Sequence, residues 1–346
     1  MKTEAMVIAR HGGPEVLERR EIEIDGPGPR EILLRVRAVA LNHLDLWVRR
    51  GGPAFRLEYP HRLGSDIAGE VEALGPGARG VAAGDRVLVS PGLSCGICAA
   101  CLTGRDNLCR KYRVLGENTQ GGYVRHLVVP DTNVLPIGPE LPVTSAAAFP
   151  LATLTAWQMV HDKAEVRGEQ TVVVHAAGSG VSTVIIRLCK MLGARVIATT
   201  TSPDKVDRAR ALGADEVIVT SQADYLGEVK RLTGKRGADV IFDHLGGPML
   251  RQAIAAAAWG GRIVTCGATA GFSVDIDLRQ IFFRQVELLG STMGSKGSLV
   301  RAMPMLLDGR LRPIVDRVVP LWSAAEAHAL LESGKVFGKV VLDVEG

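Results

Sequence analysis

The sequence predicts an α/β protein in which a β-rich domain precedes a doubly wound, parallel six-stranded sheet. Three observations support this fold. The chain has 346 residues, enough for two domains. Up to about residue 145, short β-branched runs are separated by Gly and Pro turns. After Pro150 the pattern changes to strands alternating with helices, which is typical of right-handed crossovers in a parallel sheet.

The first domain is expected from short runs that have the composition of strands. Turn signals such as GPGP, GPG and AAGD separate them, and no long amphipathic helix interrupts them. The runs are Glu31–Ala40, Gly69–Ala73, Arg86–Ser90 and Val124–Val129. The last stretch, ending KVFGKVVLDV, returns to a β-pattern, so we expect it to rejoin this domain.

Six apolar runs predict the strands of the second domain. They are Thr171–His175, Arg195–Thr199, Glu216–Val219, Asp239–Asp243, Arg262–Cys266 and Val286–Leu289. A helix with a buried stripe should follow the first run, because apolar residues recur there at helical spacing from Val181 to Leu192. Six strands fit two mononucleotide-binding halves. We therefore predict domains at 1–148 and 149–288, with 289–346 completing the first.

The composition argues against nucleic-acid and membrane partners. The 41 basic and 37 acidic residues are mixed along the chain and give a net charge of +4, without a run of five like charges. The N-terminus turns polar within ten residues, and no window holds about 18 consecutive apolar residues. We therefore expect a cytoplasmic enzyme that acts on a small-molecule substrate.

Four of the six cysteines lie within the fifteen residues CGICAACLTGRDNLC. In a reducing compartment, clustered cysteines favour metal ligation over disulfides. Four thiolates satisfy the tetrahedral preference of Zn²⁺ and leave no position for water or substrate. The spacing therefore predicts one structural Zn²⁺ bound by Cys95, Cys98, Cys101 and Cys109. The other two, Cys189 and Cys266, lie in apolar patterns and are predicted to be packing residues.

A dinucleotide site is predicted where the first strand of the second domain runs into HAAGSGVS. Small residues there allow backbone N–H groups at a helix start to approach a pyrophosphate. The strict G-x-G-x-x-G pattern is absent, and Ala177, Ser179 and Ser182 stand at its glycine offsets. The predicted contacts are Ala177, Gly178, Ser179, Gly180 and Val181.

The end of the second strand bears on the choice of dinucleotide. An acid there would bind the ribose 2′-OH of NAD, whereas this chain reads TTTSPDK from Thr199. Hydroxyl donors and an ammonium suit a 2′-phosphate. We therefore predict NADP(H), held by Thr200, Thr201, Ser202 and Lys205. If the Thr and Ser residues only cap the next helix, NAD(H) stays possible.

Together these motifs resemble the medium-chain dehydrogenase/reductase family, which includes zinc alcohol dehydrogenases and quinone oxidoreductases. The resemblance spans nearly the whole chain and rests on AVALNHLDLWVRRG, GSDIAGEV, the four-cysteine lobe, PLATLTAW, AAGSGVS, GGRIVTCGA and GKVVL. It implies a GroES-like catalytic domain, completed by the C-terminal segment, and a Rossmann domain. It also implies a homo-dimer or homo-tetramer, and it likens the cysteine lobe to the structural zinc loop of the family.

The chain departs from the family at the catalytic zinc. The positions that resemble the usual Cys, His and second Cys ligands hold Asn42, Ser65 and Leu151. Because Asn and Ser bind Zn²⁺ poorly and Leu does not bind it, we expect no metal there. The proton relay also fails, since Leu44 and Trp47 stand in its places. Alcohol oxidation, which needs a Lewis acid and a proton path, is therefore disfavoured.

What remains resembles the zinc-independent reductases of the family, which transfer hydride from NADPH to an enone, enoyl or quinone substrate. Asn42 is the predicted hydrogen-bond donor to the developing enolate, with a local turn as its alternative role. Asp45 and Asp66 are the other predicted catalytic-site residues, and we expect them to form an internal hydrogen-bond or ion-pair network. The alternative is that they flank the vacated metal site and, with His43 or His61, form an improvised metal site. The rival functions are a zinc-dependent alcohol or aldehyde dehydrogenase and a non-catalytic dinucleotide-binding protein.

The resemblance implies further cofactor contacts. His43 matches a position that contacts the pyrophosphate, and Thr155 matches a Thr that contacts the nicotinamide. The backbone at Gly267 and Ala268, after the fifth strand, should meet the carboxamide. Substrate specificity is expected in the loops Arg49–Tyr59 and Leu278–Phe283, whose shape one sequence does not define.

Overall fold

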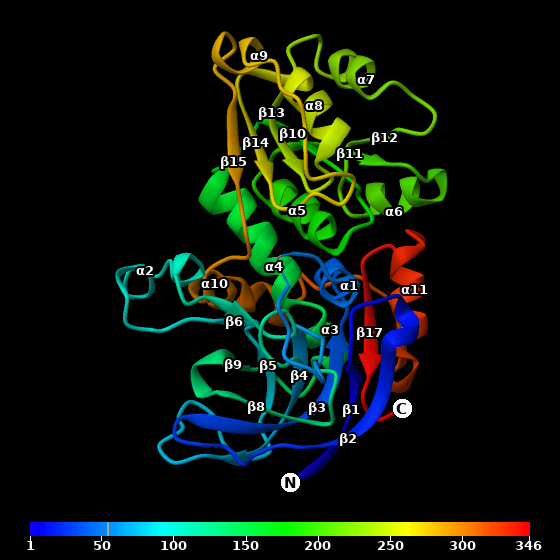
Figure 1. The fold of residues 1–346 in the computed structure, drawn as a ribbon. Coiled ribbons are helices and arrows are strands. Elements are labelled where there is room, and N and C mark those ends of the chain that lie inside the picture. The colour runs from blue at the N-terminus through cyan, green and yellow to red at the C-terminus, as the bar shows by residue number, and fades with distance from the viewer. Residues whose placement is uncertain (54) are drawn as a thin grey trace. The chain divides into compact units, whose positions relative to one another are not determined.

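The structure, a computed structural model, describes residues 1–53 and 55–346. The chain divides into two units, each visible in Figure 1. Unit 1 comprises residues 1–152 and 295–346, and unit 2 comprises residues 153–294. The domain boundaries predicted after residues 148 and 288 stay predictions.

Unit 1 is built around a seven-stranded sheet of order β16-β17-β3-β4-β5-β9, in which β8 also pairs with β3. Its strands are β3 (Glu31–Ala40), β4 (Asp66–Leu74), β5 (Arg86–Val89), β8 (His126–Pro130), β9 (Val134–Pro136), β16 (Val315–Pro320) and β17 (Lys339–Asp343). Two small sheets pair β1 (Lys2–Ile8) with β2 (Leu17–Glu23) and β6 (Gly92–Leu93) with β7 (Arg113–Val114). The C-terminal β17 pairs antiparallel with β3, placing Val341 opposite Ala40.

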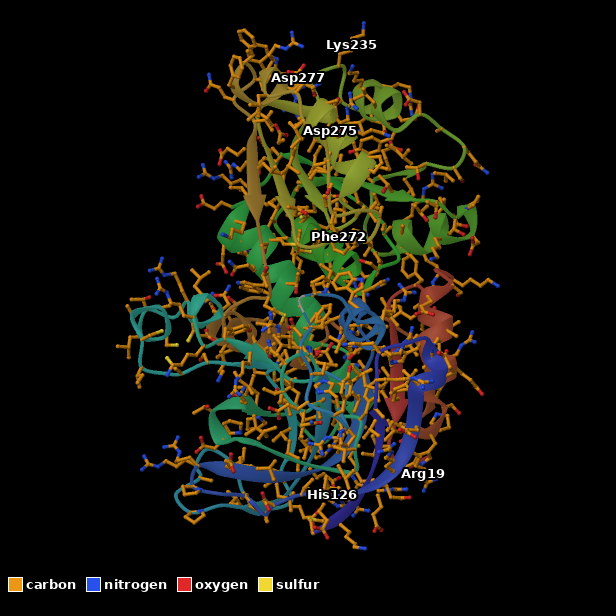
Figure 2. All side chains as sticks on the ribbon, in the orientation of Figure 1. Arg19, His126, Lys235, Phe272, Asp275 and Asp277 are labelled. Carbon is orange, nitrogen blue, oxygen red and sulfur yellow. The ribbon has the colours of Figure 1, made fainter. Side chains whose placement is uncertain are left out.

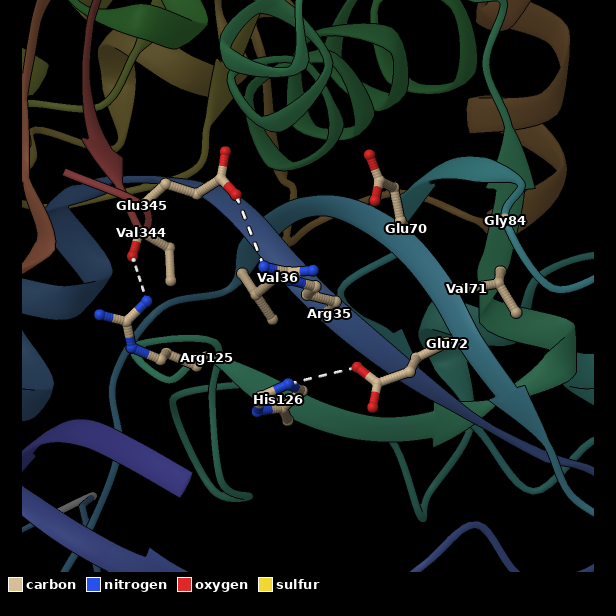
Figure 3. A pocket seen from close by; sticks show the side chains of 10 residues that line it. All are labelled: Arg35, Val36, Glu70, Val71, Glu72, Gly84, Arg125, His126, Val344 and Glu345. Atoms are coloured by element: carbon tan, nitrogen blue, oxygen red, sulfur yellow. Dashed lines mark hydrogen bonds and ion pairs between the residues drawn. The ribbon is translucent and has the colours of Figure 1, made fainter. Parts of the chain in front are cut away.

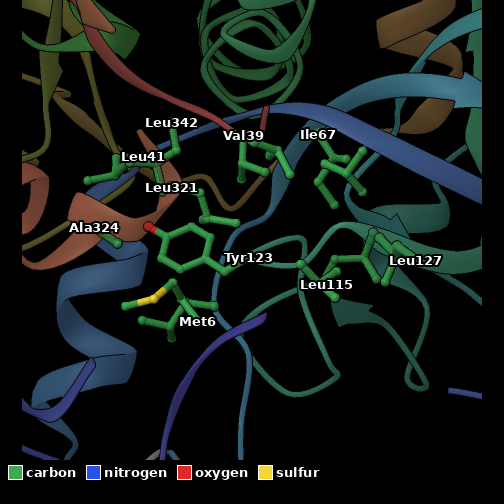
Figure 4. Packing of buried hydrophobic residues seen from close by; sticks show 14 of the residues in the cluster. Met6, Val39, Leu41, Ile67, Leu115, Tyr123, Leu127, Leu321, Ala324 and Leu342 are labelled. Carbon is green, nitrogen blue, oxygen red and sulfur yellow. The ribbon is translucent and has the colours of Figure 1, made fainter. Parts of the chain in front are cut away.

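The core of unit 1 forms because the strands turn their apolar residues inward. Figure 4 shows Met6, Val39, Ile67 and Tyr123 packed in this cluster, and all four are buried. The helices are α1 (His43–Arg50), α2 (Ala99–Leu102), α3 (Val143–Ala147), α10 (Lys296–Leu307) and α11 (Ala324–Glu332), and α4 (Pro150–Trp157) crosses the unit boundary. The 3₁₀ turns are η1 (Pro14–Val16), η2 (Asp106–Leu108), η3 (Asp131–Asn133) and η6 (Leu321–Ser323).

Unit 2 contains a six-stranded parallel sheet of order β12-β11-β10-β13-β14-β15. The strands are β10 (Thr171–Val174), β11 (Arg195–Thr200), β12 (Glu216–Val219), β13 (Ala238–Asp243), β14 (Ala257–Thr265) and β15 (Glu287–Gly290). The helices are the π-helix η4 (Gln158–Lys163), α5 (Gly180–Met191), the 3₁₀ turn η5 (Pro203–Lys205), α6 (Val206–Ala211), α7 (Tyr225–Leu232), α8 (Gly247–Ala256) and α9 (Arg279–Phe282). The predicted doubly wound sheet is confirmed.

The predicted helix after the first strand of this sheet is α5. Val184, Ile185 and Leu188 are buried, whereas Val181 and Leu192 at the two ends of the stripe are half-buried. Among the described residues, no helix combines the length and apolar character that a membrane crossing requires.

Candidate functional site

The four cysteines of the predicted zinc loop converge in unit 1, with sulfur drawn yellow in Figure 2. Their Sγ atoms lie within 4.8 Å of one another. Cys95 Sγ is 3.5 Å from Cys109 Sγ and 3.9 Å from Cys101 Sγ. A tetrahedron with Zn–S bonds of about 2.3 Å has edges of about 3.8 Å, so the cluster fits a structural Zn²⁺. Backbone N–H groups of Ile97 and Cys98 lower the pKa of Cys95 to about 6, which favours the thiolate ligand.

A second group of polar residues gathers where β3 leads into α1. Asp45, fully buried in the first turn of α1, accepts from the backbone N–H of Asn42 at 2.7 Å and from that of Gly64 at 2.9 Å. One carboxylate thus joins the start of α1 to the turn before β4. Burial raises the pKa of Asp45 to about 6, and the two backbone donors partly oppose this shift.

Gly64 fixes the backbone where β4 begins. Its φ is +95°, a conformation that favours glycine, and an added Cβ would lie 2.5 Å from the ring of Tyr123. The next two residues, Ser65 and Asp66, are fully buried. The hydroxyl of Ser65 has no hydrogen-bond partner among the described residues.

The contacts of Lys339 complete this group, and sequence reasoning did not anticipate them. Lys339 opens β17 and is 4% exposed, and its Nζ lies 2.6 Å from Oδ1 of Asn42 and 2.9 Å from Oδ2 of Asp66. Nδ2 of Asn42 donates to the same Asp66 oxygen at 3.0 Å and to the Ala40 carbonyl at 3.4 Å. The other Asp66 oxygen accepts from the Leu151 backbone at 2.7 Å. We call Asn42, Asp66 and Lys339 the Lys339 cluster.

The Lys339 cluster decides whether a catalytic zinc fits this chain. The three positions that resemble metal ligands hold an amide, a hydroxyl and an aliphatic side chain, at Asn42, Ser65 and Leu151. The amide oxygen of Asn42 accepts from a buried ammonium, and a dication beside that charge would be repelled. Among the described residues, only the four cysteines bring three or more His, Cys, Asp or Glu ligands close enough to share a metal. The residues therefore do not fit a catalytic zinc.

The predicted dinucleotide turn follows β10 in unit 2. Ala176 adopts a φ of +46°, and the next residue, Ala177, donates its backbone N–H to Thr199 O at 2.7 Å, tying the turn to β11. Ser179 caps α5 by accepting from the Ser182 backbone N–H at 3.1 Å. The helix runs for 12 residues from Gly180, so its N-terminal dipole points at this turn. The segment fits a pyrophosphate.

The segment that follows β11 carries charges of both signs, at Asp204 and Lys205. The Thr200 hydroxyl accepts from the Ser202 backbone N–H at 3.1 Å. The Ser202 hydroxyl donates to Asp204, and this bond lowers the pKa of the Asp204 carboxyl. Lys205 is 9% exposed, whereas Thr201 is exposed to solvent. A 2′-phosphate here would be attracted by Lys205 and repelled by Asp204.

The remaining residues of unit 2 that are predicted to contact the nucleotide lie along the same edge of the sheet. Gly267 and Ala268 follow β14 and are half-buried. They approach the turn after β13, because a Cβ on Gly246 would lie 3.0 Å from the Cα of Ala268. Since the carboxyl ends of parallel strands share one edge, Ala177, Thr200 and Gly267 are brought together there.

Two other predicted cofactor residues lie on helices. His43 is the first residue of α1 and is exposed, with its ring 6.5 Å from that of Trp47. Although part of His43 faces solvent, the protein packed around its ring lowers its pKa, and Lys339 and Arg50 lower it further. Thr155 is buried within α4.

The predicted specificity loops differ in exposure. In Arg49–Tyr59, Arg49 is fully buried and bonds His328 Nδ1 at 2.9 Å and the Glu332 carboxylate, so this Arg holds α1 against α11. Ala54 of the same loop lies outside the described residues. In Leu278–Phe283, Phe283 is 63% exposed.

Sequence reasoning also missed His175. This side chain is fully buried at the end of β10, with Nδ1 2.9 Å from Asp243 Oδ1 and Nε2 2.9 Å from the Tyr225 hydroxyl. The bond to Asp243 joins the carboxyl end of β10 to that of β13. These strand ends form part of the sheet edge at which the predicted dinucleotide residues lie. The available signal for His175 was a polar residue directly after the apolar run TVVV. The corresponding signal for Lys339 was a single charged residue directly before the apolar run VVL.

Comparisons with known proteins agree with this geometry. The family models described as "Alcohol dehydrogenase GroES-like domain" and "Zinc-binding dehydrogenase" match residues 28–139 and 180–308. A crystal structure of an NAD-dependent alcohol dehydrogenase is 49% identical, with a TM-score of 0.94 over 99% of both chains. An NAD-dependent alcohol dehydrogenase of Sulfurisphaera tokodaii is 30% identical over 98% of this chain and 99% of its own. The quinone oxidoreductase of Homo sapiens is 25% identical over 98% and 97%. The predicted GroES-like and Rossmann parts are confirmed.

Proposed function

The chain belongs to the medium-chain dehydrogenase/reductase family of oxidoreductases, and we propose that it reduces activated double bonds with NADPH. The substrate class is an enone, enoyl compound or quinone. The observation that carries the proposal is the Lys339 ammonium, 2.6 Å from Oδ1 of Asn42. Asn42 stands at the position that resembles a zinc ligand of the family, and the Lys339 ammonium lies beside it. The chain is therefore suited to chemistry that needs no metal as a Lewis acid.

The Lys339 cluster has the chemistry for this reaction. The bound dinucleotide supplies a hydride to the β-carbon of the substrate. Negative charge then develops on the substrate oxygen and requires a donor. The Lys339 ammonium donates a hydrogen bond to Oδ1 of Asn42, and this bond polarises the amide N–H groups of Asn42. Its bond to the Ala40 carbonyl is long, at 3.4 Å, so this N–H is the one we assign to the oxygen. A proton from solvent completes the reduction.

NADP(H) is the cofactor that we propose, with NAD(H) as the alternative. Lys205 and the hydroxyls of Thr200 and Thr201 favour a 2′-phosphate. The ionised Asp204 opposes it. The two similar alcohol dehydrogenases reported above are named NAD-dependent, which supports the alternative.

Alcohol oxidation is the second candidate function. The names of the 49% identical crystal structure and of the Sulfurisphaera tokodaii relative favour it. The name of the human relative favours quinone reduction instead. The Lys339 cluster separates the two, because an alkoxide needs a metal or an equally strong acid beside it. A third possibility, dinucleotide binding without catalysis, has no supporting residue of its own.

The test is a paired assay of the purified protein. Turnover is measured with NADPH and NADH against 2-cyclohexenone, crotonyl-CoA and 1,4-benzoquinone, and with both oxidised cofactors against primary and secondary alcohols. We expect reduction with NADPH and no alcohol oxidation. Asn42→Ala should lower kcat by about 100-fold, whereas Asp207→Asn, at a 98% exposed side chain, should leave it unchanged. If the protein oxidises alcohols but does not reduce enones or quinones, the proposal is wrong and alcohol oxidation is the better-supported function.

We also propose a homodimer formed through unit 2. Strand β15 is the last in the order of the six-stranded sheet, and Leu288 on it is 41% exposed. Trp259 on the neighbouring β14 is 73% exposed. An apolar edge strand is a surface that a second copy can cover. Sedimentation velocity of the protein and of Leu288→Arg tests this, with a dimer and a monomer as the expected results.

A further inference from the structure

A pocket of about 600 Å³ lies within unit 1, apart from the Lys339 cluster. The end of β2, strand β8 and the segment from Arg113 to Gln120 line it. Its walls combine polar residues with apolar side chains, among them Ile22, Leu93 and Leu127. This volume falls in the range of pockets that bury small organic ligands.

The pocket contains a buried arginine without a counter-charge. Arg62 is 9% exposed, and its Nε is fully buried without a hydrogen-bond partner. Among the described residues, no carboxylate pairs with its guanidinium. Its backbone N–H donates to Gln120 Oε1 at 2.9 Å, and Gln120 Nε2 donates to the Pro60 carbonyl at 3.2 Å, so the backbone that carries the side chain is fixed.

The lack of a partner is specific to this pocket. Another pocket of unit 1, of about 370 Å³, is shown in Figure 3. Its charges satisfy one another, since His126 Nε2 lies 3.2 Å from Glu72 Oε2 and Arg125 donates to the Val344 carbonyl and pairs with Glu4. Burying a cation without such compensation is costly. Burial alone lowers the pKa of Arg62, to about 10, and no acid offsets it.

Three of the four other charged residues of the pocket lie in solvent, and the fourth is occupied by the backbone. Glu23, Asp25 and Arg113 line it but are exposed, so water and salt screen them. The carboxylate of Glu31, half-buried, accepts from the Gly28 backbone at 2.9 Å. Arg62 is therefore the charge that decides which ligand the interior accepts.

We propose that this pocket binds a small organic anion, a carboxylate or a phosphate monoester with an apolar body, whose charged group pairs with Arg62. A guanidinium offers a planar pair of N–H donors that match either group. The apolar side chains of the walls accept the body of the ligand. This site is independent of the proposed reduction.

Isothermal titration of the NADPH-bound protein with 4-bromobenzoate and with phenyl phosphate tests the proposal. We expect binding of at least one of the two, and the tighter probe identifies the anionic group. Arg62→Gln should weaken it by at least about tenfold, because a charge-assisted pair is lost. Arg310→Gln is the matched control, since Arg310 pairs with Asp308 outside the pocket, and it should change nothing. Failure of both probes to bind, or equal binding by Arg62→Gln, overturns the proposal.

A second measurement uses the unaltered protein, so its result does not depend on whether the Arg62→Gln variant folds. Crystals of the unaltered protein soaked in 4-bromobenzoate should show an anomalous bromine peak in this pocket, with the carboxylate on Arg62. A crystal of the phenyl phosphate complex provides the same test for phosphorus. Peaks found only elsewhere, for instance at the Lys339 cluster, would refute the site.

Discussion

Lys339 is a buried cation whose position two strands determine. It opens β17, and the pairing of β17 with β3 brings it to Asn42 at the end of β3. A buried ammonium is stable only when it is paired, and Asp66 supplies the opposite charge at 2.9 Å. The same contacts orient the Asn42 amide. Lys339 thus both orients the Asn42 amide and supplies the positive charge beside it.

Replacement of Lys339 by Met should lower kcat for enone reduction by about 100-fold. The substitution removes the positive charge and leaves Asp66 buried without its partner, so the protein should also lose stability. The double variant Lys339→Met with Asp66→Asn removes both charges. If it folds as stably as the unaltered protein but stays inactive, the charge itself serves the reaction. Full kcat in the double variant would show that the cluster is only structural.

Asp45 should make stability depend on pH. Its pKa is raised to about 6 in the folded protein against 3.8 for the free group. Between these values the folded chain retains a proton that the unfolded chain has released. The contribution of Asp45 to the free energy of unfolding therefore falls as pH rises, by about 1 kcal/mol between pH 5 and pH 7. Urea unfolding of the protein and of Asp45→Asn measures it.

The variant should be less stable at both pH values, because the Asn oxygen can accept from only one of the two backbone N–H groups and its NH2 group faces the other. Its stability should lack the fall of about 1 kcal/mol that Asp45 contributes. Parallel pH profiles for the two proteins would show that the Asp45 carboxyl does not titrate in this range.

At the scale of elements, the turn before β4 sets the geometry of the cluster. Gly64 combines a φ of +95° with contact to Tyr123 and a bond to Asp45. An alanine here meets both backbone strain and overlap, whereas Gly80, with a φ of +87°, has open space around its Cα. Gly64→Ala should therefore destabilise unit 1 by about 1–3 kcal/mol more than Gly80→Ala. Equal losses in urea unfolding would contradict this.

The elements of unit 2 could be predicted from the sequence because each strand contains a short run of apolar, mostly β-branched residues, and β10, β11 and β13 are buried almost throughout. β12 was predicted at its observed bounds, and β10 and β11 to within one residue. In unit 1, β3 was predicted at its bounds, but β1 and β2 were not predicted. The sequence of β2, LERREIE, is rich in charged residues and mostly exposed, so it lacks the apolar signal of a strand.

The candidate site was only partly predictable. The cysteine spacing predicted the lobe, because ligand geometry is local in the sequence. The Asn42, Ser65 and Leu151 positions were found by resemblance. Lys339 was missed because it lies far along the chain from Asn42, and only the pairing of β17 with β3 brings them together. The sequence also could not show that the buried Arg62 side chain has no carboxylate partner among the described residues, because this depends on which side chains the fold places near it.

At the scale of the whole molecule, we predict that each chain binds one zinc. Unit 1 provides a cysteine cluster that fits one zinc, and the Lys339 cluster provides a cation where a second metal does not fit. The most direct measurement is the zinc content per chain of active, cofactor-bound protein by elemental mass spectrometry. One zinc per chain, together with enone or quinone reduction, is the expected result. Two zincs per chain would contradict the account and make alcohol oxidation the leading function.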